Sequence, residues 1–166
     1  RIRLTLGKTY QNLGLLEEAE RHSRIGVDLL RTHNEPGAME TLIYANSLAA
    51  TLLHRGLYAE AAELLEPLVE ARRDKAGIRE EMVLVSSTNL SWAYMRLGRL
   101  AEAEPLILDA LEGKRATLGN THERTLTSVS LASTLYSMLG DFDRAHDFHI
   151  EAYESRAAKL GEKHPS

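Results

Sequence analysis

Apolar positions recur along the chain at the three- and four-residue spacings of an amphipathic helix. Leu90, Tyr94 and Leu97 fall on one helical face, and a second stripe begins at Leu100, after Gly98. We find no sustained alternation of apolar and polar residues bounded by turns, which is the pattern of a strand. The sequence therefore predicts an all-α protein built from the motif helix, glycine turn, helix.

This motif occurs four times, and its glycines stand at a constant interval of 42 residues. A small residue precedes each glycine by seven positions, and an alanine follows it by five. Glycine adopts the left-handed conformation of a helix C-terminus without a Cβ penalty, and small residues let paired helices approach closely. The positions are Gly7, Gly14 and Ala19; Ala49, Gly56 and Ala61; Ser91, Gly98 and Ala103; Ser133, Gly140 and Ala145.

A single helix pair cannot bury its apolar face alone, so neighbouring pairs are expected to stack and share a core. This predicts a superhelical solenoid in one domain, with about four repeats at 1–32, 38–75, 80–117 and 122–159. We call these ranges units one to four. The chain begins with Arg1 and ends within a repeat motif, "LGEKHPS", so we expect a fragment of a longer protein.

Composition and charge indicate which kinds of protein and partner are compatible with this chain. Hydrophobic residues make up 43% of the 166 residues and charged residues 27%, which is typical of a folded chain. A net charge of −4 gives no sign of the basic patch of a nucleic-acid-binding protein. There is no run of about 18 apolar residues, no signal peptide and no cysteine. We expect a cytoplasmic protein with no nucleic-acid or membrane partner.

The order Ser91, Tyr94, Gly98, Leu100 and Ala103 resembles the tetratricopeptide repeat (TPR). The 42-residue interval is similar to the longer kinesin light chain type, whose junction resembles "LGxxHPxTLxxxxNLAxxL". The matching stretch here is "LGNTHERTLTSVSLASTL", in which a glutamate replaces the proline, so that helix start is less sharply specified. The resemblance implies a right-handed superhelix of stacked TPR hairpins.

The resemblance also implies that the first helix of each unit lines a concave groove that binds peptides or partner helices. Asparagine offers a donor and an acceptor to an extended backbone, tryptophan is enriched in binding hot spots, and Arg96 and Lys8 could pair with carboxylates. A structural alternative stays open, in which Asn89 bonds to the adjacent helix turn and Trp92 packs between units. The candidate groove residues are Lys8, Asn12, Asn46, Thr88, Asn89, Trp92, Arg96 and Thr134.

The sequence gives little support for a metal site or for an enzyme. Asp143, His146 and His149 stand at three-residue spacing, but no second ligand cluster matches them, so we expect no metal and no cofactor. Phosphate-loop, dinucleotide and nucleophile-elbow motifs are missing, so we expect no enzyme, although an enzyme fragment stays open.

The sequence favours a protein–protein interaction module, the scaffold or regulatory part of a larger protein, that binds a peptide or partner segment. The alternative is a structural spacer and self-association solenoid without a peptide ligand. The last helix, about 141–158, carries Phe142, Phe148, Ile150 and Tyr153, which predicts a possible homo-oligomer through the C-terminal end.

Overall fold

A computed structural model describes residues 2–32, 38–76 and 81–163. Within these ranges the chain forms four successive helix pairs and no strand. The predicted all-α solenoid is confirmed. The helices are α1 (Ile2–Asn12), α2 (Leu16–Arg31), α3 (Met39–His54), α4 (Tyr58–Ala76), α5 (Glu81–Arg96), α6 (Leu100–Leu118), α7 (Glu123–Leu139) and α8 (Phe142–Lys163).

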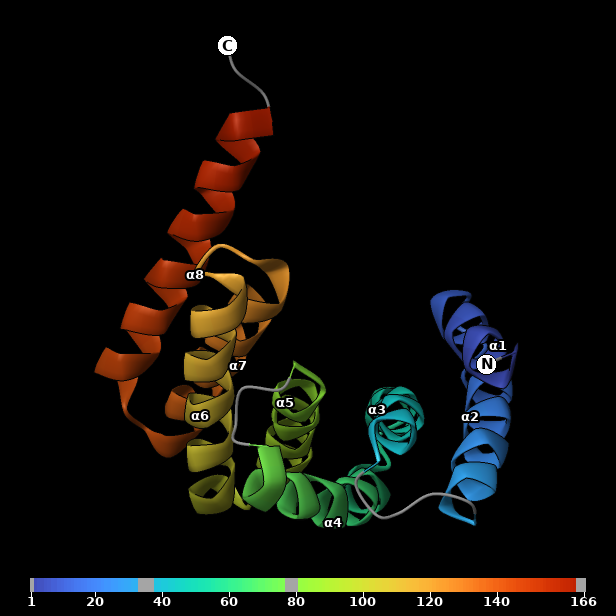
Figure 1. Ribbon diagram of the computed structural model, residues 1–166. Coiled ribbons are helices and arrows are strands. Elements are labelled where there is room, and N and C mark those ends of the chain that lie inside the picture. The colour runs from blue at the N-terminus through green and yellow to red at the C-terminus, as the bar shows by residue number, and fades with distance from the viewer. Residues whose placement is uncertain (1, 33–37, 77–80, 164–166) are drawn as a thin grey trace.

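Each helix packs against the next along the chain, so the pairs stack in sequence order (Figure 1). The α1–α2 pair lies at one end of the stack, and α8 lies at the other. Buried side chains from Val27 to Leu135 form one cluster, and Phe148 joins it to a smaller cluster around Leu111 and Val129. The core is therefore shared between neighbouring pairs, as a solenoid requires.

The recurrent glycines turn the chain between the helices of each pair. Gly98 has φ +77°, and the N–H of the following Arg99 donates to the carbonyl of Tyr94 at 2.9 Å. This is the six-to-one bond of a Schellman motif, which needs a left-handed residue at the turn. Equivalent bonds run from Leu15, Leu57 and Asp141, and Gly14, Gly56 and Gly140 also have positive φ. The predicted turn is confirmed.

The small residues let the helices of a pair approach closely. Ser91 Oγ donates to the carbonyl of Ala103 at 3.0 Å, and Ser133 Oγ donates to that of Ala145 at 2.8 Å. In the first pair, a Cβ added at Gly7 would stand 2.7 Å from Ser23 Oγ. A larger side chain in this column would force the helices apart.

Candidate binding surface

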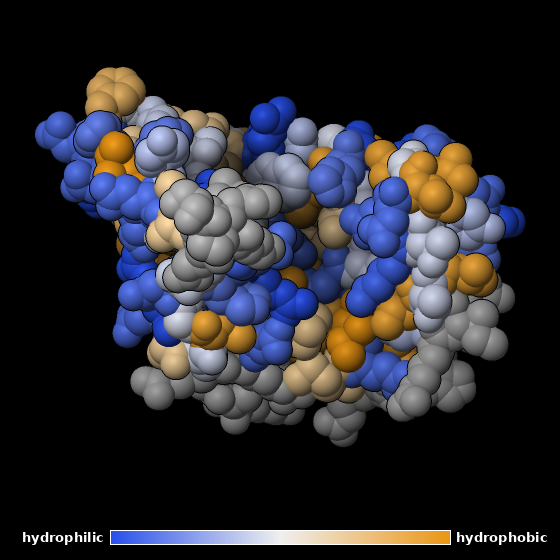
Figure 2. All heavy atoms as spheres, turned by 90° about the horizontal axis from the view of Figure 1, so that it is seen from above, coloured by the Kyte–Doolittle hydropathy of each residue, from blue (hydrophilic) through white to orange (hydrophobic). Residues whose placement is uncertain are grey.

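The first helices of the four pairs lie on the inner side of the curved stack. Helix α3 contacts α1, α5 contacts α3, and α7 contacts α5, whereas no two second helices in the described ranges come within 8 Å of each other between Cα atoms. Successive first helices are therefore closer together than successive second helices. Figure 2 shows a hollow between the arm that ends in α8 and the arm formed by α1 and α2.

Two of the candidate groove residues, Asn46 and Asn89, are directly bonded. Asn89 Nδ2 donates to Asn46 Oδ1 at 3.2 Å, and Asn46 Nδ2 donates to Ser86 Oγ at 2.8 Å. Asn46 also donates to the carbonyl of Met82 at 3.5 Å. Only 5% of Asn46 is exposed, whereas Asn89 is half-buried. The pair ties α3 to α5, and Asn89 is the member that a ligand could reach.

Trp92 lies one helical turn beyond Asn89 on α5 and is half-buried. Its ring meets that of His54 edge to face, with centroids 5.7 Å apart. Arg96, the last residue of α5, is exposed, and its Cζ lies 5.0 Å from the centroid of the Tyr58 ring. Trp92 therefore has one face against the protein and part of its ring open to a partner.

Three further candidates are exposed at the two ends of the row of first helices. Lys8 and Asn12 are exposed on α1, and Thr134 is exposed on α7. The Thr134 hydroxyl donates to the carbonyl of Ser130 at 3.0 Å, within its own helix. These side chains lie on α1 and α7, away from the bonded pair on α3 and α5. They therefore stand at the two ends of the candidate binding surface.

Thr88 does not fit the groove assignment. Only 8% of it is exposed, its hydroxyl donates to the carbonyl of Leu84 at 2.8 Å, and it accepts a hydrogen bond from Lys114 Nζ at 2.7 Å. Thr88 points toward α6 and α7, because it lies about 100° around the helix from its neighbour Asn89.

Sequence analysis missed Lys114, a lysine that is 3% exposed on α6. Its Nζ donates to Thr88 and, at 2.8 Å, to Ser128 Oγ, and no carboxylate among the described residues pairs with it. Burial lowers the pKa of Lys114 to about 8. Its burial could have been predicted from the sequence, because Lys114 follows Ile107 and Leu111 at helical spacing in an otherwise apolar row.

The outer side of the stack carries clusters in which a tyrosine lies between a glutamate and an arginine, and sequence analysis did not predict them. The Tyr94 hydroxyl donates to Glu66 Oε1 at 2.9 Å, and Arg99 Cζ lies 3.9 Å from the centroid of the Tyr94 ring. Burial and the neighbouring Glu66 carboxylate raise the pKa of Tyr94 to about 12. Tyr136, Glu104 and Arg144 form the equivalent cluster in unit four. Each cluster joins the second helix of one pair to the turn of the next.

The part of the chain that the structure describes holds no group of three or more histidine, cysteine or acidic side chains placed to bind a metal ion. Of its helices, none is both long and apolar enough to cross a membrane.

Two family models match the chain, and both describe the tetratricopeptide repeat. One matches residues 83–158 and the other residues 41–79. A search of the curated proteins gave no match.

Solved structures similar to the chain include a Podosopora anserina putative kinesin light chain with nearly identical TPR-like repeats. It is 25% identical, with a TM-score of 0.84, over 99% of this chain and 78% of that one. BtubC (BKLC) from P. vanneervenii is 21% identical, with a TM-score of 0.76, over 92% and 60% of the two chains. The apo form of RapI is 14% identical, with a TM-score of 0.79, over 97% and 56%. The last two likenesses concern the fold alone.

Proposed function

Because the chain belongs to the tetratricopeptide repeat family, with repeats like those of kinesin light chain, and is a protein–protein interaction module, we propose that its concave face binds an extended segment of a partner protein. The observation that carries the proposal is the reachable amide of Asn89 beside the half-buried ring of Trp92, both on α5.

The chemistry of this surface suits an extended peptide. The Asn89 amide offers a donor and an acceptor, which can pair with the backbone of a ligand in any sequence context. Its orientation is held by the bond to buried Asn46, so little side-chain entropy would be lost on binding. Trp92 offers apolar area at the centre of the row, and Lys8 at one end offers a positive charge.

Trp92 is the single tryptophan of the chain, so its fluorescence reports on this surface alone. We would select binders from a library of short random peptides and titrate each into the protein. A ligand that covers Trp92 shifts the emission maximum to shorter wavelength, because the indole loses water. Binding without any change in Trp92 emission would place the ligand elsewhere and refute the groove.

Substitutions inside and outside the groove test whether the groove is the surface that binds the peptide. Asn89→Ala is expected to weaken a selected peptide about tenfold, and Trp92→Ala more, because each removes a central contact. Arg21→Ala on the second helix of unit one is the matched control and should leave affinity unchanged. Equal affinity of all variants, measured by calorimetry with helical circular dichroism intact, would contradict the assignment.

A second candidate function, self-association through α8, rests on a difference between equivalent positions 42 residues apart. Leu111 is 2% exposed in unit three, where α7 follows it, whereas Tyr153 is 67% exposed in unit four. Beside Tyr153 lies a hollow of about 510 Å³, lined also by Ser130 and Arg156. An apolar surface of this kind could be buried against a second copy.

Sedimentation equilibrium tests this second candidate. We expect a concentration-dependent dimer, and Tyr153→Glu should return it to monomer, because the carboxylate would be desolvated in the contact. Leu13→Glu, at an exposed position on the α1–α2 turn, is the control. A wild-type protein that stays monomeric at high concentration would exclude self-association.

A further inference from the structure

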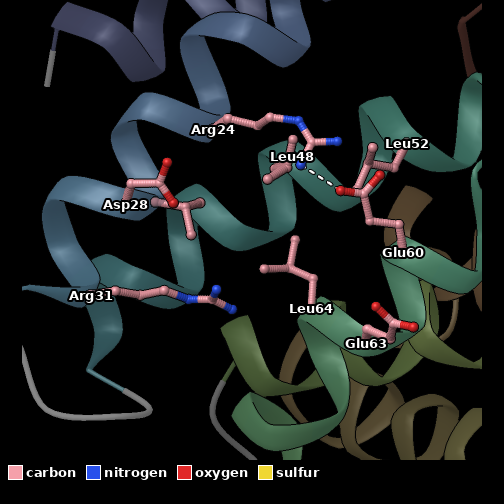
Figure 3. Close-up of a pocket in the computed structure, with 9 residues that line it drawn as sticks. Arg24, Asp28, Arg31, Leu48, Leu52, Glu60, Glu63 and Leu64 are labelled. Atoms are coloured by element: carbon pink, nitrogen blue, oxygen red, sulfur yellow. Dashed lines mark ion pairs between the residues drawn. The ribbon is translucent and has the colours of Figure 1, made fainter.

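Each junction between two successive helix pairs is built in the same way. The second helix of one pair packs on the first helix of the next, as α2 does on α3, α4 on α5 and α6 on α7. On the outer side an ion pair also joins the two units, as Arg24 of α2 and Glu60 of α4 do at 2.5 Å (Figure 3). Among the described residues, α8 has no further helix packed on it, and the α1–α2 pair lies at the opposite end of the stack (Figure 1). The interval of 42 residues therefore identifies which residues of the two ends would meet if a second copy continued the stack.

The junction between units three and four gives the first such comparison. Arg115 of α6 and Glu151 of α8 form its ion pair, at 2.6 Å. The equivalent positions at the two ends of the molecule are Ala157 of α8 and Ile25 of α2. Ala157 is exposed, and Ile25 is 36% exposed. Both members of the pair are thus apolar where the chain ends, so their contact would leave no unpaired charge.

The junction between units two and three gives the same result. Glu66 of α4 pairs with Arg99, the residue before α6, at 2.9 Å. The equivalent positions at the two ends are Ile150 of α8 and Leu15, the residue before α2, which are 38% and 50% exposed. An ion pair within the chain again corresponds to two exposed apolar side chains, one on each end.

A third pair of positions keeps polar groups that fit each other. Glu104 of α6 lies 3.4 Å from Arg144 of α8. The equivalent positions at the two ends are His146 of α8 and Glu18 of α2. His146 is exposed, and the imidazole can donate a hydrogen bond to the Glu18 carboxylate, whose two oxygens can accept more than the bond from Arg21. The two ends are therefore complementary at all three pairs of positions.

We propose that two copies of this chain associate head to tail, with the α1–α2 pair of one copy packed on α8 of the other as unit four packs on α6. The proposal rests on self-association through α8, the second candidate function above, and names the surface of the second copy that meets it. Tyr153 is then covered by the second copy, as Leu111 is covered by α7. Because the two surfaces differ, the contact is heterologous and each added copy leaves a free end. The expected dimer is then the first member of a series that grows with concentration.

Two substitutions, one at each end, test this pairing. Ile25→Glu blocks the α2 surface and Tyr153→Glu blocks the α8 surface, because each would bury a carboxylate without a partner. Glutamate is the residue that unit four carries at the position of Ile25, namely Glu151, so the helix can accommodate it. In sedimentation equilibrium we expect each variant alone to be a monomer. Their equimolar mixture should form a dimer that does not grow, because one intact surface of each kind remains.

The other outcomes separate this contact from self-association in general. An Ile25→Glu protein that dimerises alone would overturn the head-to-tail contact and leave self-association through α8 in place. A wild-type protein that stays monomeric would overturn both. Leu97→Glu, 41% exposed on the turn between α5 and α6, is the control and should associate like the wild type. Loss of association in this control would also overturn the proposal, because added charge away from both ends would then have the same effect.

A restored ion pair tests the register of the contact. We expect Ile25→Glu to weaken association at least about tenfold, and Ala157→Arg in the same chain to recover most of this loss, because it recreates the pair of Arg115 and Glu151 between two copies. Ala116→Arg, at an exposed position of α6, is the matched control and should recover nothing. Equal recovery in both double variants, or none in either, would overturn the register. Helical circular dichroism checks the fold, and should Ile25→Glu not fold, Leu15→Arg blocks the same end and Ile150→Glu restores the pair.

Discussion

The interior and the outer side of this solenoid use polar groups in opposite ways. Between the stacked helices, Asn46 and Lys114 are almost fully buried and bond to amides, hydroxyls and a carbonyl. On the outside, arginines pair with glutamates that remain in contact with water, as Arg21 does with Glu18. A buried polar group is expensive to leave unsatisfied, whereas an exposed ion pair adds little. We therefore expect each buried contact to contribute more to the free energy of unfolding than each exposed ion pair.

The largest effect is expected for Asn46→Ala. This change removes one acceptor and two donor contacts between α3 and α5 and leaves space beneath Asn89. We expect the free energy of unfolding to fall by about 2–3 kcal/mol, measured by urea denaturation. Asn12→Ala, which removes the same amide at an exposed position of α1, should change it by less than about 0.5 kcal/mol. Similar losses in both variants would remove the distinction between buried and exposed amides.

Lys114→Met should stabilise the protein. Methionine keeps the length of the side chain and removes a desolvated charge, and both Thr88 and Ser128 retain a carbonyl acceptor in their own helix. We expect a gain of about 1–2 kcal/mol at neutral pH. A loss of stability in this variant would mean that the two hydroxyl contacts outweigh desolvation of the ammonium group.

The same substitution changes the pH dependence of stability. The pKa of Lys114 is about 8 in the folded protein, against about 10.4 for a free lysine side chain. Between these values the unfolded chain holds a proton that the folded chain has lost, so wild-type stability rises with pH through this window. Urea titrations from pH 7 to above 10 should show this rise reduced in Lys114→Met.

On the outer side, Tyr94→Phe should have a smaller effect. It removes the hydroxyl that donates to Glu66 but keeps the ring beneath Arg99. We expect a loss of about 1 kcal/mol in the free energy of unfolding. Tyr153→Phe, at an exposed position of α8, gives the background for the same chemical change. A loss as large as that of Asn46→Ala would mean that the outer clusters stabilise the protein as much as the buried contacts do.

The smallest effect belongs to the exposed ion pairs. Arg21 lies 2.7 Å from Glu18 one turn earlier on α2, and both side chains are exposed. Arg21→Ala should change the free energy of unfolding by less than about 0.5 kcal/mol, and added salt should reduce even this difference. A salt-independent loss above 1 kcal/mol would show that the pair belongs to a larger network.

Sequence periodicity was enough to predict the helices, the turns and the stacking. The glycine column specifies its own backbone conformation, and the alanine and serine columns specify close helix contacts, because both depend on the size of one side chain. The groove residues were harder to predict. Thr88 and Asn89 are adjacent and both polar, yet Thr88 is buried against Lys114, whereas Asn89 is half-buried and bonds to Asn46.

The sequence by itself determined the repeat, since a fixed interval of glycines and apolar positions permits only one kind of local structure. Tertiary structure decided which polar side chains are buried, because burial depends on the neighbouring pair and not on the residue's own helix. Arg156 and Lys114 occupy the same repeat position, but Lys114 lies beneath α7 and is buried, whereas Arg156 is exposed in the part of the chain that the structure describes.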